Sequence, residues 1–281
     1  MLIGQDNLRD TFKRLIKDGD LAHGYIFFGE PQVGKYSFAL SLAAFLEDGE
    51  FEEIETESGL PKRILEEALI IKPVEGSIGI DSVREIRHFL SQMPVKSNLR
   101  VVIIDDADTM TVQAQHATLK IGEEPPSKSL IILVTQNFDS LLETLKSRFQ
   151  KIHFPRLSAG EITGLLEKHH NVDKKNADEL AALSLGRPGR AVSLATNDSA
   201  KKQFKNATAL LSRKEPKRKI IDEVLESEIE MRALLTEIIA KLANDPVKNY
   251  DILKSITERM TAMSQFSTNK RLQLESAIWT I

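Results

Sequence analysis

The chain has no cysteine among its 281 residues, a single tryptophan and few aromatic side chains. Without cysteine there is no disulfide bond, no thiol nucleophile and no zinc site built on thiolates. No apolar run approaches the roughly 20 residues that a membrane helix needs. The N-terminus also lacks the basic flank and the apolar core of a signal peptide. We therefore expect a cytoplasmic protein without a membrane anchor.

The chain is not globally basic, because its formal net charge is −3. A protein that coats nucleic acid is typically strongly basic, so this class is excluded, although a local patch could still serve. Charged residues gather in an acidic block at 47–57 and a basic block at 201–219. We interpret both as solvated loop and helix surfaces. Whether the basic block contacts DNA stays open.

Short apolar segments alternate with helical patterns in the first half of the chain. The apolar segments are residues 25–28, 68–71, 100–104, 130–134 and 151–154. Strands that alternate with helices form a parallel sheet with helices on both faces. The sequence therefore predicts an α/β nucleotide-binding domain over residues 1–156.

From Ser158 onward only helical patterns occur. Ser158 and Glu161 have the spacing of a capping box at the start of a helix. Apolar stripes at helical spacing continue to the C-terminus, with Pro216 and Pro246 in the loops between them. We expect a small helical lid over residues 157–197 and an all-α bundle over residues 198–281.

A glycine-rich turn follows the first predicted strand and precedes a helix. Gly29, Gly34 and Lys35 fit the pattern Gly-x4-Gly-Lys, in which backbone amides cradle phosphates and the lysine reaches the β- and γ-phosphates. The pattern next requires serine or threonine as a magnesium ligand, but this chain has Tyr36. The turn is compatible with ATP or ADP, and magnesium is expected to bind weakly or not at all. The alternative is a tight glycine turn without a ligand.

Two aspartates close the third predicted strand, at the edge where parallel sheets place their functional side chains. Asp105 stands where a carboxylate orients magnesium, and Asp106 stands where a hydrolytic site places the acid that activates water. Because aspartate is one methylene shorter than the usual glutamate, hydrolysis is expected to be weak or absent. Alternatively these aspartates and Asp108 cap the following helix, which is the interpretation favoured for Asp108.

Arg148 follows a predicted helix over residues 140–147. Alone, an arginine there more often satisfies the last helix carbonyls than takes part in catalysis. In a chain with a P-loop and an acidic strand end it suggests an arginine finger, which accelerates phosphoryl transfer at a neighbouring site by about 10³–10⁵-fold.

The ordered set of motifs resembles the clamp-loader branch of AAA+ proteins, most closely the delta-prime subunit family of bacterial DNA polymerase III. The similar stretches are residues 21–35, 77–86, 101–110, 123–126, 147–149, 186–191 and 269–275. The resemblance implies an AAA+ domain, a lid and a C-terminal collar that assembles with gamma/tau and delta subunits into a pentamer. It further implies that the pentamer opens the sliding clamp and places it on primed DNA.

By position, the resemblance implies that residues 29–35 are the Walker A motif and that Asp105 and Asp106 are the Walker B motif. It places Gln136 at approximately the sensor-1 position and makes Arg148 the finger of a Ser-Arg-Cys motif.

Several positions depart from the family pattern, in addition to Tyr36 and Asp106. Phe149 replaces the cysteine after the arginine, and Gly189 stands where ATPase-competent relatives carry a sensor-2 arginine. The zinc module that many relatives insert between the Walker motifs is missing. These departures weaken nucleotide turnover in this chain and leave Arg148 intact.

The leading hypothesis is therefore a clamp-loader subunit of the DNA polymerase III holoenzyme. Its own ATPase is expected to be weak or absent, and it supplies Arg148 to the ATP site of a neighbour. The alternative is an active AAA+ ATPase, either a gamma/tau-like motor or a helicase or junction-processing enzyme. A third hypothesis is an ATP-binding adaptor unrelated to replication. Tyr36 argues against the active ATPase, because an active motor is expected to keep the magnesium-binding hydroxyl, and the stretch 269–275 argues against the adaptor.

Overall fold

The computed structural model describes residues 5–52, 54–57, 59–212, 217–224, 227–243, 245–265 and 270–279. The chain divides into two compact units, Met1–Ala191 and Val192–Ile281. The predicted boundary between the α/β domain and the lid falls inside the first unit, and the division into three domains stays a prediction. None of the helices in the described part of the chain combines the length and the apolar content needed to cross a lipid bilayer.

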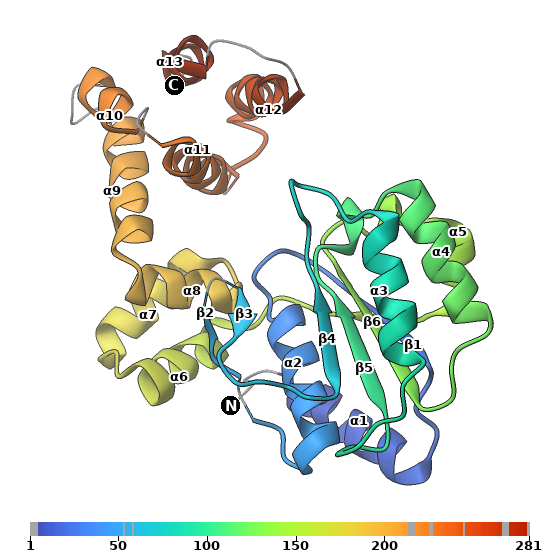
Figure 1. Cartoon of the computed structure of the whole chain (residues 1–281). Helices are drawn as coiled ribbons and strands as arrows, with labels where there is room; N and C mark the ends of the chain where they lie inside the picture. The colour runs from blue at the N-terminus through green and yellow to red at the C-terminus, as the bar shows by residue number, and fades with distance from the viewer. Residues whose placement is uncertain are drawn as a thin grey trace. The chain divides into compact units, whose positions relative to one another are not determined.

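Five parallel strands form the main sheet of the first unit, in the order β4-β5-β6-β1-β7 (Figure 1). The strands are β1 (Gly24–Phe28), β4 (Ala68–Ile71), β5 (Arg100–Ile104), β6 (Ser129–Thr135) and β7 (Gln150–His153). Each overlaps one of the predicted apolar segments, with bounds that differ by at most one residue at either end. The central strand β6 is buried along its whole length, as expected of a parallel strand covered on both faces. The predicted α/β class is confirmed.

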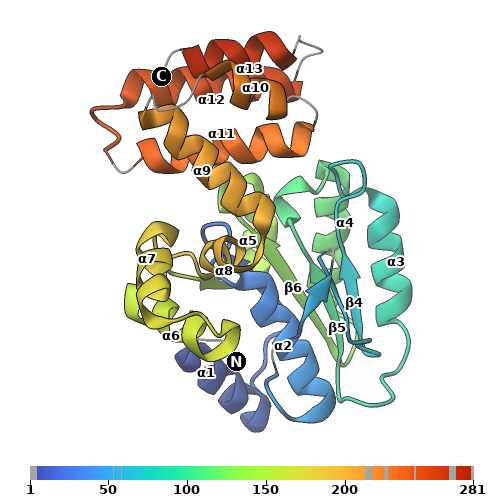
Figure 2. The same cartoon turned by 90° about the vertical axis from the view of Figure 1, so that its left-hand side faces the viewer.

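Helices cover both faces of this sheet (Figures 1 and 2). Within β5, Val101 and Ile103 pack on one side, while Val102 and Ile104 pack on the other, because successive side chains of a strand point to opposite faces. The first face carries α1 (Asp6–Asp18) and α2 (Lys35–Asp48). The second face carries α3 (Ile80–Leu90), α4 (Val112–Glu123) and α5 (Glu143–Arg148).

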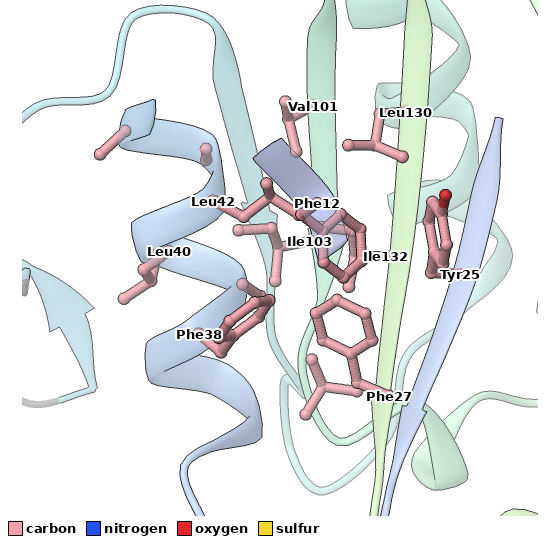
Figure 3. Packing of buried hydrophobic residues seen from close by; sticks show 14 of the residues in the cluster. Phe12, Tyr25, Phe27, Phe38, Leu40, Leu42, Val101, Ile103, Leu130 and Ile132 are labelled. Carbon is pink, nitrogen blue, oxygen red and sulfur yellow. The ribbon is translucent and has the colours of Figure 1, made fainter. Parts of the chain in front are cut away.

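A cluster of aromatic rings joins α1 and α2 to β1 (Figure 3). The ring of Phe12 lies 5.0 Å from Tyr25, 6.0 Å from Phe27 and 5.6 Å from Phe38, measured between ring centroids. Tilted and edge-on pairs at these distances stabilise a core beyond the burial of their apolar area. This cluster fixes α2, and therefore the glycine turn at its N-terminus, against the sheet.

The connection after α2 contains a small antiparallel hairpin that the sequence did not predict. Its strands are β2 (Thr56–Glu57) and β3 (Leu60–Pro61). Gly59 forms the turn with a φ of 79°, a conformation that favours glycine. The hairpin was missed because strands of two residues are too short to show an alternating pattern.

Helices alone follow the sheet. The first unit continues with α6 (Ala159–His170), α7 (Lys174–Ser184) and the start of α8 (Pro188–Thr196). The predicted capping box of α6 is confirmed, because the Ser158 hydroxyl accepts a hydrogen bond from the backbone of Glu161 while the Glu161 carboxylate accepts one from the backbone of Ser158. The hydrogen bond from the Ser158 hydroxyl, followed by that from its backbone, lowers the pKa of Glu161.

The second unit is a helical bundle, as predicted. Its core contains apolar side chains such as Leu210, Ile221, Leu234, Ile256 and Ile278. Its described helices, after the end of α8, are α9 (Asp198–Ser212), α10 (Lys217–Val224), α11 (Glu228–Leu242), α12 (Tyr250–Gln265) and α13 (Lys270–Trp279). Asn269, the first residue of the last motif that resembles the family, lies outside the described residues.

Phe149 is buried at the end of α5 and packs against two glycines. A Cβ atom on Gly24 of β1 would lie 2.5 Å from Cε1 of the Phe149 ring, and one on Gly122 of α4 would lie 2.8 Å from Cε2. Both distances are too short for any side chain. Glycine at these two positions therefore makes room for phenylalanine where the family pattern has cysteine, and the ring fixes the end of the helix that carries Arg148.

We predict that Gly24→Ala destabilises the first unit by about 1–3 kcal/mol, because the buried ring has to move to accept the methyl group. Urea denaturation and hydrogen exchange of peptides from β1 and β6 measure the effect. Gly164→Ala in α6 is the matched control, since its Cβ would meet nothing within 4 Å. That control is expected to be neutral or to stabilise by up to about 1 kcal/mol. Equal effects of the two substitutions would contradict this account of Phe149.

Candidate functional site

The candidate site lies at the carboxyl ends of β1, β5 and β6, which are neighbours in the sheet. The glycine turn follows β1, Asp105 and Asp106 follow β5, and Gln136 follows β6. The amide of Gln136 donates a 3.2 Å hydrogen bond to the Asp106 carboxylate. The topology thus brings together the predicted P-loop, Walker B and sensor-1 residues at the edge where open α/β sheets bind ligands.

The backbone of the glycine turn requires glycine at both predicted positions. Gly29 has a φ of 145°, and a Cβ atom there would lie 2.5 Å from the carbonyl oxygen of Phe154. Gly34 has a φ of 96° and is the N-cap of α2. The same turn holds Gln32 at a φ of 64°, which is uncommon for a residue with a side chain.

Lys35 is directed back into this turn. Its side chain is buried, and its Nζ donates hydrogen bonds of 2.8 Å to the carbonyl of Gly29 and 2.5 Å to the carbonyl of Glu30. Burial lowers the pKa of Lys35, while nearby carboxylates, Asp105 and Asp106 first, act in the opposite direction. The ammonium group that would reach a phosphate is therefore satisfied by the turn's own carbonyls.

Tyr36 does not place a hydroxyl where the pattern needs a magnesium ligand. Its phenol donates a 2.9 Å hydrogen bond to the carbonyl of Gly59, in the turn of the β2–β3 hairpin. Burial, and to a lesser extent the charge of Asp105, raise the pKa of Tyr36. The phenol is therefore neutral and serves as a hydrogen-bond donor to the hairpin.

Asp105 is paired with a lysine that the sequence did not single out. Nζ of Lys72, the residue after β4, lies 2.7 Å from Oδ2 of Asp105. The same Nζ lies 4.3 Å from the centroid of the Tyr36 ring. The available signal was the position of Lys72, because β4 and β5 are parallel neighbours and their carboxyl ends meet at one edge of the sheet.

These residues do not fit a magnesium ion. Magnesium requires oxygen ligands in near-octahedral geometry at about 2.0–2.1 Å. Here one carboxylate oxygen of Asp105 is held by an ammonium group, and the hydroxyl of Tyr36 is directed to a backbone carbonyl. That Gly29, Gly34 and Lys35 bind a nucleotide stays a prediction. In this structure the ammonium group of Lys35 is hydrogen-bonded to carbonyls of the same turn.

Asp106 occupies a strained and partly buried position. Its φ of 49° and ψ of 48° are left-handed, a conformation in which aspartate and asparagine are among the few tolerated residues. Burial, followed by the charge of Asp105, raises the pKa of Asp106, and the hydrogen bond from Gln136 opposes these effects. Ionisation of Asp106 is therefore less favourable in the folded protein than in the unfolded chain.

The favoured interpretation of Asp108 as a helix cap is wrong. The N-cap of α4 is Thr111, whose hydroxyl accepts a hydrogen bond from the backbone of Ala114. Asp108 lies inside a short 3-10 helix, η1 (Ala107–Thr109), which separates Asp105 and Asp106 from α4. Asp108 instead accepts hydrogen bonds from the Thr135 hydroxyl at 2.9 Å and the Gln136 backbone at 3.2 Å, so it links β5 to β6.

Residues that follow the sheet in the first unit contact the glycine turn. The backbone N–H of Gly189 donates a 3.0 Å hydrogen bond to the carbonyl of Gln32. A Cβ atom on Gly189 would lie 3.1 Å from Cβ of Gln32, so a larger residue there requires a shift of the turn. Arg156 also forms an ion pair with Glu30 at 2.7 Å. Any side chain at Gly189, where ATPase-competent relatives are expected to carry the sensor-2 arginine, would therefore press on the backbone of Gln32 in this arrangement.

Arg148 lies apart from these residues, at the C-terminal end of α5. Its side chain is 51% exposed, and its Nη2 lies 3.5 Å from Oε1 of Glu123, which is itself 46% exposed. Among the described residues, Arg148 forms its ion pair with Glu123. It does not pair with Asp105 or Asp106. Exposed pairs of this kind contribute about 0–1 kcal/mol, so the guanidinium is released at little cost.

The sheet, the glycine turn and the acidic strand end define an AAA+-like protein, and similar solved structures agree on the fold. A DNA polymerase III gamma-subunit-related protein from Thermotoga maritima has a TM-score of 0.57 at 20% identity, over 96% of this chain and 97% of that chain. The RuvB Holliday junction branch migration motor from the same organism has a TM-score of 0.51 at 16% identity, over 75% of this chain and 64% of that chain. At these identities the likeness shows the fold alone.

The family model "DNA polymerase III, delta subunit" matches residues 4–158, more than half of the chain. The chain therefore belongs to the delta/delta' family of DNA polymerase III clamp-loader subunits, and the predicted family is confirmed.

Individual relatives bear the names of polymerase III subunits. The tau subunit from Bacillus subtilis is 26% identical over 63% of this chain and 32% of its own length. The delta' subunit from the same organism is 30% identical over 65% of this chain and 56% of its own length. The chain spans about a third of the length of the tau and gamma/tau relatives that it matches.

We predict that Asp106→Asn stabilises the first unit at neutral pH. The raised pKa means that ionised Asp106 disfavours folding, and this penalty develops as pH rises from the unfolded carboxyl pKa through the folded one. Asparagine tolerates the same left-handed backbone, so the substitution isolates the charge. The gain in melting temperature is therefore expected to grow as pH rises above about 4, the ordinary carboxyl pKa, and to level off above the raised pKa of the folded state. Asp139→Asn, at an exposed position, is the control. A destabilised Asp106→Asn protein at pH 7 would contradict the assignment.

Proposed function

We propose that the chain is a clamp-loader subunit that acts on a neighbouring subunit's ATP site and does not turn over nucleotide itself. Membership of the delta/delta' family supports its place in the DNA polymerase III clamp loader. The rest of the proposal is supported by one contrast. The groups of the chain's own candidate site are bound to one another, whereas the side chain of Arg148 is exposed.

Three features of the candidate site support the lack of turnover. The ammonium of Lys35 is held by the carbonyls of its own turn, the phenol of Tyr36 is directed to the hairpin, and Asp105 is paired with Lys72. In P-loop ATPases, the corresponding groups bind the β- and γ-phosphates and the magnesium ion. Each is satisfied within this chain, so binding a metal–nucleotide complex requires three separate rearrangements.

The geometry of Arg148 supports a role at another subunit. It ends a short helix that Phe149 fixes from within the core, so its backbone is held firmly while its side chain stays exposed. An arginine finger needs this combination, because the guanidinium has to meet the transferred phosphoryl group in a defined orientation. The weak pair with Glu123 keeps the side chain ordered until a partner's nucleotide replaces it.

The proposed partners follow from the family. We infer that the chain assembles with gamma/tau and delta subunits, and that the second unit is the collar through which it does so. The resulting complex would open the sliding clamp on primed DNA. The relatives that carry the names tau, gamma/tau and delta' support this group of partners. An active motor is less well supported, because the likeness to RuvB shows the fold alone.

We predict that Arg148→Ala lowers the ATPase activity of the reconstituted complex while assembly is unchanged. The site that Arg148 completes is expected to lose about 10³-fold or more of its rate, so the complex loses that site's share of turnover. Steady-state ATP hydrolysis and mass photometry measure the two properties.

Lys151→Ala is the matched control, because it removes an exposed positive charge from the adjacent strand β7. It is expected to leave both properties intact. Unchanged hydrolysis by the Arg148→Ala complex would reassign this arginine to a structural role.

A further inference from the structure

Lys72 has three neighbours that hold its ammonium group at the end of β5. The first is the carboxylate of Asp105, with Nζ and Oδ2 2.7 Å apart. The side chains of Lys72 and Asp105 are 28% and 15% exposed, so the pair is partly shielded from water. An ion pair with hydrogen-bond geometry in such a place is stronger than one on the open surface.

The second neighbour is the ring of Tyr36, whose centroid lies 4.3 Å from Nζ of Lys72. A cation is attracted to the face of an aromatic ring at this distance. The ring is fixed because its hydroxyl is hydrogen-bonded to the carbonyl of Gly59. Tyr36 therefore has two effects: it does not supply a metal ligand, and its ring contacts the ammonium group of Lys72.

The third neighbour is the turn of the β2–β3 hairpin. A Cβ atom on Gly59 would lie 3.1 Å from Nζ of Lys72, so glycine lets the ammonium group approach the turn without a shift of the lysine side chain. The hairpin belongs to the short connection that follows α2. Three segments distant in the sequence, at Tyr36, Gly59 and Asp105, thus converge on one lysine.

We propose that the ammonium of Lys72 takes the place of the magnesium ion at Asp105. The chain then carries its own cation and does not accept a metal–nucleotide complex. Oδ1 of Asp105 accepts a 3.2 Å hydrogen bond from the backbone of Asp106, and a metal ligated by Oδ2 has to lie about 2.1 Å from it, next to the point where Nζ now lies. Two cations cannot share this position, because their repulsion is strong where water is largely excluded. Tyr36 stands where the pattern has serine or threonine, and its ring contacts the lysine that pairs with Asp105. The same tyrosine thus lacks the metal ligand and contacts the cation that replaces the metal.

This inference deepens the proposed function and rests on its claim that the chain does not turn over nucleotide. It adds the physical reason, which is occupation of the metal position by a side chain. It also distinguishes a site that has merely lost a ligand from one that has gained a competitor. Only the second kind regains metal affinity when the competitor is removed.

The test is paramagnetic broadening by Mn²⁺ in the nuclear magnetic resonance spectrum of the full chain. In the natural protein, the amide signals of Ile71, Asp105 and Asp106 are expected to be no more affected than signals elsewhere. In Lys72→Gln, Mn²⁺ is expected to broaden these signals selectively. Lys72→Arg keeps a cation and is expected to behave like the natural protein.

Lys62→Gln is the matched control, because it removes a lysine of the same connection whose ion pair with Glu55 is exposed. It is expected to show no selective broadening. If Lys72→Gln does not fold, Lys72→Met replaces it, since the thioether keeps a contact with the Tyr36 ring. Selective broadening in the natural protein, or none in the folded neutral variants, would overturn the proposal. Either result leaves the Arg148 test independent, because that test is measured on the assembled complex.

Discussion

Charge balance at the carboxyl ends of β4, β5 and β6 is the constraint on which the site depends. Three aspartates follow β5 in four residues, and partly buried carboxylates need counter-charges or hydrogen-bond donors. An active P-loop protein supplies part of this charge with a bound metal. Here Lys72 pairs with Asp105, Gln136 donates to Asp106, and Thr135 donates to Asp108. These contacts partly compensate the three carboxylates without a ligand, and a ligand would have to displace them.

Arg148 shows the opposite arrangement within the same fold. Its backbone is anchored by the buried ring of Phe149, but its charge is left in an exposed pair with Glu123. The pair of Lys72 and Asp105 in the candidate site is short and partly shielded, whereas the contact of Arg148 is long and solvated. Groups with satisfied partners resist new ligands, and groups with weak partners accept them. The structure therefore favours action on a ligand outside the chain over action on one within it.

The sequence predicted the sheet well, because each strand is a continuous apolar segment bounded by polar residues. The residues at the strand ends were also found, since a strand, a glycine turn and a helix occur in a recognisable order. Lys72 was missed because its role depends on β4 and β5 being neighbours, which a linear pattern does not reveal. Asp108 was assigned to a cap because the intervening helix η1 cannot be anticipated from three residues. The hairpin that covers Lys72 was missed because its strands have two residues each.

The central claim is that this chain does not turn over nucleotide on its own. Steady-state ATP hydrolysis by the purified chain, with magnesium present and with a Lys35→Ala variant beside it, tests this claim most directly. We expect the natural chain to hydrolyse ATP at the background rate, so that the substitution removes nothing. Turnover comparable to that of a motor subunit, abolished by Lys35→Ala, would contradict the account.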